Sequence, residues 1–564
     1  MNSVERYKQE KHPLEVIEDV AEYAAEGLSF DEIEDRAGDG EWERLKWAGL
    51  YTQKQRGYFM IRTKVPGGRL TPDQAEVIGD VADDYAVAPE EYGGESQNPV
   101  WGDAYLDITT RQDIQKHWIR LEDIPTMWER YDEVGLTTIQ GCGDGARNVL
   151  GCPAAGLDDH ECFDAQPVVD AVSDFFTGNH EYANLPRKFK MSITGCSEDC
   201  AQSQINDIGL VPATKEIDGE LYYGFHARVG GGLSDGPRMG SELDVFILPE
   251  DAVEFCRAVA QVFKELGDRH NRGLCRMRYL VEQLGPETFE EAVRDRCDVD
   301  LRSQGSETVS GYTGDHVGVH SQKQDGLVYV GFNVIAGRMG GAEFAEAARA
   351  AKRYGTADTT IRLATDQNFL ITHVPEENVE ALLAEPFAAA YQPDPGPFSR
   401  GAVACTGSEF CKYAIIETKQ RTREWARELD ERIDTPDDLE VIRMHMSGCS
   451  ASCAQPQIAD IGFRGETVKL ETDDPDRPDR IVEGMDFGLG GSLGLDNDFL
   501  DWVERAVPAE AVIPAIEQLI AVYTRDRTEG QRFYQWARET ENERLHTIMQ
   551  RAAAPVSTGV AHGD

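Results

Sequence analysis

The sequence predicts an α+β protein that arose by internal duplication, and two observations carry this prediction. First, strand-like and helix-like patterns alternate, as in YFMIRTKV at 58–65 followed by TPDQAEVIGDVADDYA at 71–86. Second, GCSEDCAQSQINDIG at 195–209 returns as GCSASCAQPQIADIG at 448–462, with similar neighbours in the same order. A repeat of this length is not chance. Two halves in a pseudo-twofold arrangement are therefore expected.

The first 130 residues predict an arm and a half-domain. Residues 1–40 are acidic with apolar residues at helical spacing, so we expect a helical arm packed on the body. Over 41–130 the pattern changes to strand, turn and helix, with Thr71 as the helix cap and Pro72 in the first turn. A further strand is expected over 104–122, followed by a short helix, which completes a βαβα half-domain.

The remaining chain divides in the same way. Residues 131–300 begin with a glycine-rich loop, TTIQGCGDGARNVLGCP, and continue through a strand, LPRKFKMSITG, into a helical stretch. The order then repeats. Residues 301–392 match the first half-domain, 41–130, and residues 393–550 match residues 131–300. The last residues, 551–564, are expected to form a tail.

The charge is strongly acidic. The chain has 56 basic and 102 acidic residues, a net charge of −46. This much like charge repels itself at low ionic strength, whereas near 1 M salt the Debye length falls to about 3 Å. The composition therefore predicts a halophilic protein of archaeal type from a salt-rich cytoplasm. It also argues against nucleic acid as a partner.

No segment predicts export or membrane insertion. The N-terminus lacks the apolar core of a signal peptide. No run reaches the roughly 18 apolar residues of a membrane span. We therefore expect a cytoplasmic protein without a membrane partner.

Four cysteines predict a metal centre. They form two close pairs, Cys405/Cys411 and Cys449/Cys453. Four thiolates at such spacings suit a tetrahedral zinc ion or an iron–sulfur cluster, and the C-x5-C spacing of the first pair, longer than usual for zinc, favours iron–sulfur. The alternative is a group of buried thiols without a metal.

These motifs resemble the sirohaem/[4Fe–4S] nitrite and sulfite reductase family, with ferredoxin–nitrite reductases the most similar. The resemblance rests on CTGSEFC followed by GCSASC and on the duplicated order, and it runs from about Trp47 to about Trp536. It implies two ferredoxin-like half-domains and two sirohaem/iron–sulfur α/β domains. It also implies sirohaem and a [4Fe–4S] cluster as cofactors, and a role in nitrate assimilation.

The resemblance assigns residues to the two cofactors and to the substrate. Its cluster ligands correspond to the four paired cysteines, and Cys453 would also be the axial ligand of the sirohaem iron. Its anion-binding residues correspond to Arg62, Arg147, Lys188 and Lys190. The stretch TTRQDIQKHW resembles a sirohaem-contacting strand, whose alternating side chains are Thr109, Arg111, Gln115 and His117. A lone histidine such as His117 is more often structural, and the lysine pair alone would also fit a solvated strand.

The first half departs from the family in its cysteines. It keeps Cys196 and Cys200 in a C-x3-C pair, together with Cys142 and Cys152. The family normally has one cluster per chain, so we interpret these four as relics of the duplication or structural thiols. A second cluster or a zinc site is the alternative. Cys162, Cys256, Cys275 and Cys297 show no paired spacing and are expected to be structural.

The substrate and donor follow less directly. The motif around Cys405 resembles nitrite enzymes, whereas Lys188-Phe189-Lys190 resembles the sulfite type. We favour reduction of nitrite to ammonium, and reduction of sulfite to sulfide is the alternative. The chain has no flavin or nicotinamide motif, so a separate carrier is expected to supply the electrons, and the resemblance implies that this carrier is ferredoxin. The basic run 269–278 is the candidate docking site. A monomer is expected, because the duplication supplies its own twofold partner. A non-catalytic iron–sulfur or zinc protein and an iron–sulfur hydro-lyase are the competing classes.

Overall fold

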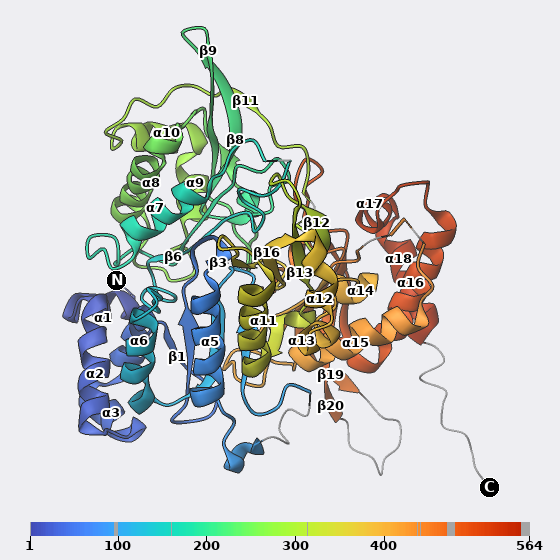
Figure 1. The fold of residues 1–564 in the computed structure, drawn as a ribbon, viewed down its shortest axis with the longest axis horizontal. Helices are drawn as coiled ribbons and strands as arrows, with labels where there is room; N and C mark the ends of the chain where they lie inside the picture. The colour runs from blue at the N-terminus through green and yellow to red at the C-terminus, as the bar shows by residue number, and fades with distance from the viewer. Residues whose placement is uncertain are drawn as a thin grey trace. The chain divides into compact units, whose positions relative to one another are not determined.

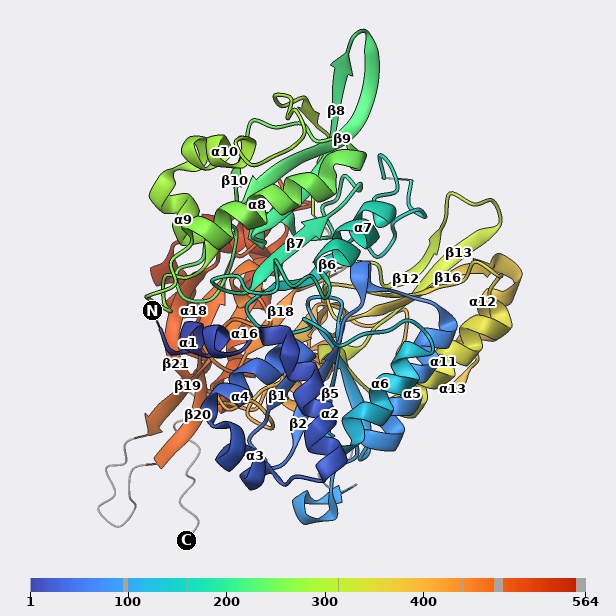
Figure 2. The same ribbon diagram turned by 90° about the vertical axis from the view of Figure 1, so that its left-hand side faces the viewer.

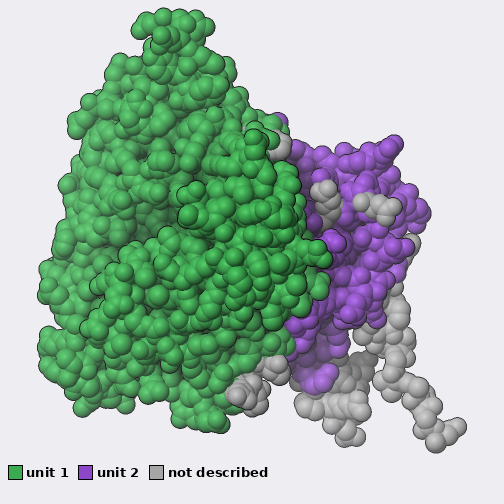
Figure 3. All heavy atoms as spheres, viewed as in Figure 1, with its two compact units in different colours: residues 1–232, 236–334, 338–393 green, residues 233–235, 335–337, 394–564 purple. Residues whose placement is uncertain are grey.

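The protein is described by a computed structural model of residues 2–94, 100–159, 161–312, 314–436, 438–439, 441–470 and 480–553. Residues 551–553 of the predicted tail belong to helix α18 (Asn542–Ala553), and the rest of the tail lies outside the described residues. The chain forms two compact units (Figure 3). Unit 1 comprises residues 1–232, 236–334 and 338–393, and unit 2 comprises 233–235, 335–337 and 394–564. No helix of the described residues is long and apolar enough to cross a bilayer.

The N-terminal segment, predicted as an arm, is helical. Its α-helices are α1 (Ser3–Glu10), α2 (Val16–Glu26), α3 (Phe30–Ala37) and α4 (Asp39–Arg44). Helix α3 begins with a capping box between Ser29 and Glu32. Val16, Val20 and Ile33 are buried in the same apolar core as the strands of the first sheet. The arm is thus an integral part of unit 1.

The two half-domains of unit 1 each contribute one short strand to the other's sheet. The first sheet has the order β1-β2-β5-β4-β14 and the second has the order β12-β13-β16-β15-β3. Strand β14 comes from the second half-domain but pairs with β4, and β3 comes from the first but pairs with β15. The duplicated α+β fold is confirmed, with this exchange added. The strands are β1 (Leu50–Thr52), β2 (Phe59–Thr63), β3 (Arg69–Leu70), β4 (Tyr105–Ile108), β5 (Ile114–Ile119), β12 (Gly318–Ser321), β13 (Leu327–Phe332), β14 (Arg338–Gly340), β15 (Ile361–Leu363) and β16 (Phe369–Pro375).

Corresponding helices of the two half-domains, α5 (Pro72–Tyr85) and α11 (Gly341–Tyr354), lie side by side (Figures 1 and 2). Helix α5 starts with the predicted cap, because the Thr71 and Gln74 side chains each accept from the other's backbone N–H. A Cβ atom on Gly79 would lie 2.6 Å from the Ala345 backbone nitrogen. Glycine therefore permits this close approach. The half-domains also contain α6 (Ile124–Asp132), α12 (Val379–Leu383) and α13 (Pro386–Ala390).

A Gly79→Ala substitution should destabilise unit 1 by about 1–3 kcal/mol, because overpacking forces the two helices apart. In an uncrowded helix the same change is stabilising by up to about 1 kcal/mol, so the sign of the effect isolates the crowding. Denaturant unfolding followed by circular dichroism in high salt measures it. A gain in stability would show that the helices have room for the methyl group.

The strand expected over 104–122 is in fact two strands joined by a tight turn, which corrects the prediction. Strands β4 and β5 form an antiparallel pair, and the turn is closed by the bond from the Thr109 N–H to the Asp113 carbonyl at 2.9 Å. Gln112 adopts a positive φ of 55° there. Thr109 and Arg111 therefore lie in the turn and do not share a strand face with Gln115 and His117.

The third sheet of unit 1 has the order β10-β9-β8-β7-β6, with β11 paired to β8. Strand β6 (Ala146–Leu150) lies within the stretch expected to be a glycine-rich loop. It pairs in parallel with β7 (Phe189–Ile193), which pairs in parallel with β8 (Ile208–Ile217). Strands β8 and β9 (Glu220–Val229) form a long hairpin that projects from the sheet (Figure 2). The remaining elements are β10 (Ser241–Glu242), β11 (Ser306–Glu307), α7 (Gln166–Phe176), α8 (Ala252–Leu266), α9 (Met277–Leu284) and α10 (Pro286–Arg294).

Unit 2 repeats this topology. Its sheet has the order β17-β18-β19-β20-β21, in which β17-β18 and β18-β19 are parallel and β19-β20 is an antiparallel hairpin. The strands are β17 (Ala402–Ala404), β18 (Met444–Ser447), β19 (Ile461–Leu470), β20 (Arg480–Leu489) and β21 (Asp501–Pro508). The helices are α14 (Pro397–Arg400), α15 (Lys419–Arg432), α16 (Val512–Asp526), α17 (Phe533–Glu539) and α18 (Asn542–Ala553).

Candidate functional site

The four paired cysteines follow two adjacent parallel strands of unit 2. Cys405 comes directly after β17, and Cys449 and Cys453 come after β18. The carboxyl ends of parallel strands meet at one sheet edge, which brings the pairs together. The Gly448 N–H donates to the Cys405 sulfur at 3.2 Å, a contact that suits a metal-bound thiolate.

The thiols of this set also influence one another. Burial, followed by the charge of Cys453, raises the pKa of Cys405 to about 12. Burial also raises the pKa of Cys449, and Cys453 and Cys411 add to that rise. Without a cation these thiols would stay protonated, so ligation must release their protons. The donor set of four sulfurs fits an iron–sulfur cluster.

In unit 1, two of the predicted anion-binding residues converge on the same carbonyl. Arg62 on β2 and Arg147 on β6 both donate to the Gly141 carbonyl, at 3.2 and 3.3 Å. Arg147 also donates to the Gly143 carbonyl at 3.0 Å. Arg62 donates to the Gln115 amide oxygen at 2.5 Å, directly across the strand pair. The loop thus holds both guanidinium groups in fixed orientations.

Lys190 lies among like charges. Burial lowers the pKa of Lys190 well below its usual range, and Arg111, Lys188 and Arg276 lower it further, against the opposing charge of Asp207. Burial also lowers the pKa of Arg111, to about 9; Asp113 and Asp207 oppose this shift, whereas Arg147 and Arg62 add to it. We call Arg62, Arg111, Arg147, Lys188, Lys190 and Arg276 the basic cluster. So many cations at one place in an acidic protein are costly unless an anion binds there.

The basic cluster retains unused donors. Arg111 donates to the Asn206 side chain at 2.9 Å and to the Asn148 carbonyl at 2.7 Å, and Arg276 pairs with Asp207 at 3.1 Å. The buried Nε atoms of Arg111 and Arg276 have no hydrogen-bond partner among the described residues. Buried donors are almost always satisfied, so these fit the carboxylates of a polyanionic cofactor such as sirohaem.

The other residues predicted to contact the cofactor have protein partners. The Thr109 hydroxyl accepts the N–H groups of Arg111 and Asp113 and closes the turn. Gln115 and His117 share a face of β5, and His117 Nε2 lies 3.4 Å from Asp107. Asp107 is itself held by Arg338 through two hydrogen bonds, at 2.7 and 3.1 Å. Their contacts with sirohaem stay a prediction.

The basic run 269–278, the predicted docking site, is exposed only in its first part. Arg276 and Arg278 are only 8% and 5% exposed, so neither can meet a partner protein. Arg269 pairs with Glu5 and Arg272 with Asp144. The prediction relied on the density of basic residues in the run. It did not foresee these ion pairs, because the carboxylates come from distant segments of the chain.

The cysteines of the first half form a different set from the one expected. Cys152, Cys200 and His316 place one ligand atom each within 4.8 Å of one another. Cys196 belongs to the same small cluster of buried residues as Cys152 and Cys200. Cys142 lies elsewhere, with its sulfur 3.9 Å from the Gly49 carbonyl. Spacing within the loop suggested a pair of Cys142 and Cys152, but strand β6 separates them.

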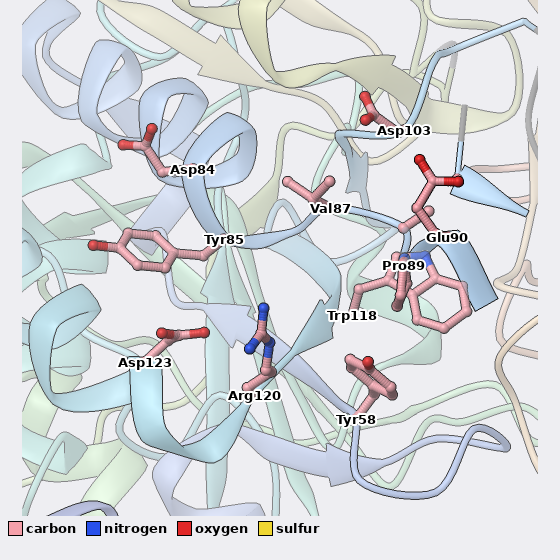
Figure 4. A pocket seen from close by; sticks show the side chains of 12 residues that line it. Tyr58, Asp84, Tyr85, Val87, Pro89, Glu90, Asp103, Trp118, Arg120 and Asp123 are labelled. Carbon is pink, nitrogen blue, oxygen red and sulfur yellow. The ribbon is translucent and has the colours of Figure 1, made fainter. Parts of the chain in front are cut away.

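One pocket of about 300 Å³ at the end of α5 is lined by none of these residues (Figure 4). Four carboxylates line it, and Arg120 is its basic residue. The acidic lining disfavours an anionic substrate. Its acidic residues are Asp84, Glu90, Asp103 and Asp123.

Comparison with known proteins decides the family. The family model described as the nitrite and sulphite reductase 4Fe-4S domain matches residues 142–301 and 396–552. The chain belongs to the nitrite and sulfite reductase family. The ferredoxin-like half domain of this nitrite and sulfite reductase family matches residues 51–89, 100–134 and 320–389.

Relatives of this reductase cover nearly its whole length. The assimilatory ferredoxin-dependent nitrite reductase of Haloferax mediterranei is 40% identical over 94% of the chain and 90% of the relative. The ferredoxin–nitrite reductase of Synechococcus elongatus is 35% identical over 92% of the chain and 96% of the relative. The solved structure of the NirA protein of Mycobacterium tuberculosis matches with a TM-score of 0.84 and 31% identity, over 96% of this chain and 97% of that chain.

Sequence reasoning on this reductase missed Asp207 and the inward position of Arg276. The Lys190 N–H donates to Asp207 at 2.8 Å, and the Arg443 N–H donates to Asp460 at 2.8 Å. Lys190 and Asp207 each precede their counterpart by 253 residues. The repeat therefore contained the signal, because the same carboxylate orients the start of the same strand in both halves.

Proposed function

We propose that this chain reduces nitrite to ammonium with six electrons delivered by ferredoxin. The observation that carries the proposal is the basic cluster, a concentration of cations in a chain of net charge −46. The curated relatives are ferredoxin-dependent nitrite reductases, which supports the same substrate and donor.

The cofactor ligands are proposed by residue. Cys405, Cys411, Cys449 and Cys453 would hold the [4Fe–4S] cluster, and Cys453 would also hold the sirohaem iron. When bound, this pair of cofactors supplies single electrons and an iron at which an oxyanion is reduced. Arg111 would bind a sirohaem carboxylate through its unsatisfied Nε, with Thr109, Gln115 and His117 as further contacts.

The remaining residues of the basic cluster would bind the substrate and deliver protons. Arg62 and Arg147 are oriented by the Gly141 carbonyl, so both guanidinium groups can hold the oxygens of an anion. Lys190 has a lowered pKa, which makes its ammonium a proton donor when an anion is bound. Lys188 adds charge that favours the bound anion.

Sulfite reduction is the second candidate, because two lysines suit a dianion. Purified holoenzyme with reduced viologen or ferredoxin in high salt should show a kcat/KM for nitrite at least about tenfold above that for sulfite. Ammonium should be the product. A higher kcat/KM for sulfite, with sulfide as product, would reverse the assignment. A protein without the red and Soret absorption bands of sirohaem would refute both reactions and favour a non-catalytic metal protein.

We also propose that the enzyme is cytoplasmic, monomeric and adapted to high salt. The charge of −46 supports the salt requirement, because screening must offset the repulsion. Dialysis from about 2 M to about 0.1 M salt should unfold the protein, with a loss of far-ultraviolet circular dichroism and of activity. Unchanged dichroism and turnover at low salt would contradict this adaptation.

A further inference from the structure

The cysteine set of unit 1 is a rearranged copy of the cluster ligands of unit 2. Cys152, Cys196 and Cys200 precede Cys405, Cys449 and Cys453, respectively, by 253 residues each. The fourth position, occupied by Cys411 in unit 2, is Asp158 in unit 1. Strand pairing supports this correspondence, because Cys152 follows β6 as Cys405 follows β17. The first half has thus lost one thiol of the set.

A histidine from outside the repeat joins the three thiols. His316 Nε2 lies 3.3 Å from the Cys200 sulfur. The ligand atoms of Cys152, Cys200 and His316 all lie within 4.8 Å of one another. Around a tetrahedral zinc ion, bond lengths of 2.0–2.3 Å separate nitrogen from sulfur by about 3.6 Å and two sulfurs by about 3.8 Å. In a cluster each thiolate binds a different iron, so a set this close suits a single ion.

The surroundings of these ligands suit a closed structural site. The exposed fractions are 2% for Cys152, 1% for both Cys196 and Cys200, and 4% for His316. Apolar residues of one small core cluster, among them Ala154, Leu157 and Leu370, surround the thiols. His316 Nδ1 lies 3.3 Å from the Tyr329 hydroxyl, a contact that orients the ring and leaves Nε2 toward Cys200. The Glu198 N–H donates to the Cys196 sulfur at 3.4 Å.

We propose that Cys152, Cys196, Cys200 and His316 bind one structural zinc ion. Four ligands leave no open position, so the ion has no role in the reduction itself. It joins the loops after β6 and β7 to the segment before β12. The site lies wholly within unit 1 and is independent of the proposed function.

Metal analysis of the holoenzyme, produced with zinc in the medium, tests this site. We expect about one zinc and about five irons per chain, the irons belonging to the cluster and sirohaem. Cys200→Ser and His316→Ala should lower zinc to below about a tenth per chain and leave iron unchanged. Cys297→Ser, a half-buried cysteine of the same unit outside the set, is the matched control and should retain zinc.

X-ray absorption at the zinc edge of the wild-type protein tests the site without any variant, so the test holds even if a variant fails to fold. Three sulfurs at about 2.3 Å and one nitrogen at about 2.0 Å are expected. Absence of zinc from the wild-type protein, a disulfide among the three cysteines, or zinc retained in Cys200→Ser would overturn the proposal. Four further irons per chain would show a second cluster instead. The absorption bands of sirohaem are read separately and test only the proposed function.

Discussion

Cys453→Ser should lose most of the cluster iron and lower nitrite turnover about a thousandfold, because one residue would ligate the cluster and sirohaem together. A serine oxygen is a poor ligand for iron in a cluster, and no other thiol of unit 2 stands in for it among the described residues. The visible spectrum, electron paramagnetic resonance of the reduced protein and iron per chain measure the loss. Turnover with reduced viologen tests it without requiring ferredoxin to dock.

Two controls make this result specific. Cys297→Ser should keep the cluster, sirohaem and turnover, since that thiol lies outside both cysteine sets. Cys200→Ser should keep the cluster as well, because it belongs to the zinc set. A Cys453→Ser protein with full cluster iron and normal turnover would show that the cluster is held by other residues.

Lys190→Met should lower kcat/KM for nitrite about 100- to 1000-fold and remove a pH dependence that the wild-type enzyme shows. The pKa of Lys190 is lowered, chiefly by burial and then by neighbouring cations, so the free protein loses the ammonium proton at a lower pH than usual. An oxyanion stabilises the protonated form. Binding of nitrite should therefore take up a proton, and KM for nitrite should rise as the pH rises through the lowered pKa.

The comparison that isolates Lys190 is the pH profile of KM. In Lys190→Met the profile should be flat in this range, whereas Lys264→Met, on the surface helix α8, should follow the wild type. A wild-type slope retained in Lys190→Met would assign the proton to another group. In Lys190→Asn, sulfite use should fall more than nitrite use, since a dianion loses more from the missing charge.

Local patterns in the sequence were enough to predict part of the fold and to propose part of the site. The cap at Thr71 depends on residues three positions apart, so its signal is complete within one turn. The repeat identified the duplicated sheets, and the paired cysteines predict the metal set proposed for unit 2. All of these features are encoded either in short spacings or in a direct match between segments.

The missed features depend on contacts between distant segments. His316 lies 116 residues after Cys200, and no spacing rule links them. Arg276 is buried by its pairing with Asp207, 69 residues away, although the run around it looks like a surface patch. Strand β3 has two residues, too few to show any alternation. The pairing of such elements is decided by the packed sheet alone.

The strand exchange in unit 1 bears on how the chain folds during synthesis. Strand β3 is made early, but its partner β15 begins only at Ile361. At about 5–20 residues per second, roughly 15–60 s pass between the two. The first sheet likewise stays incomplete until β14 has been made. Neither half-domain can therefore finish folding on the ribosome before the other has emerged. Non-local pairing of this kind slows folding and leaves edges open to other chains. The linked halves therefore gain from being made as one chain, in which each sheet meets its missing strand without a search.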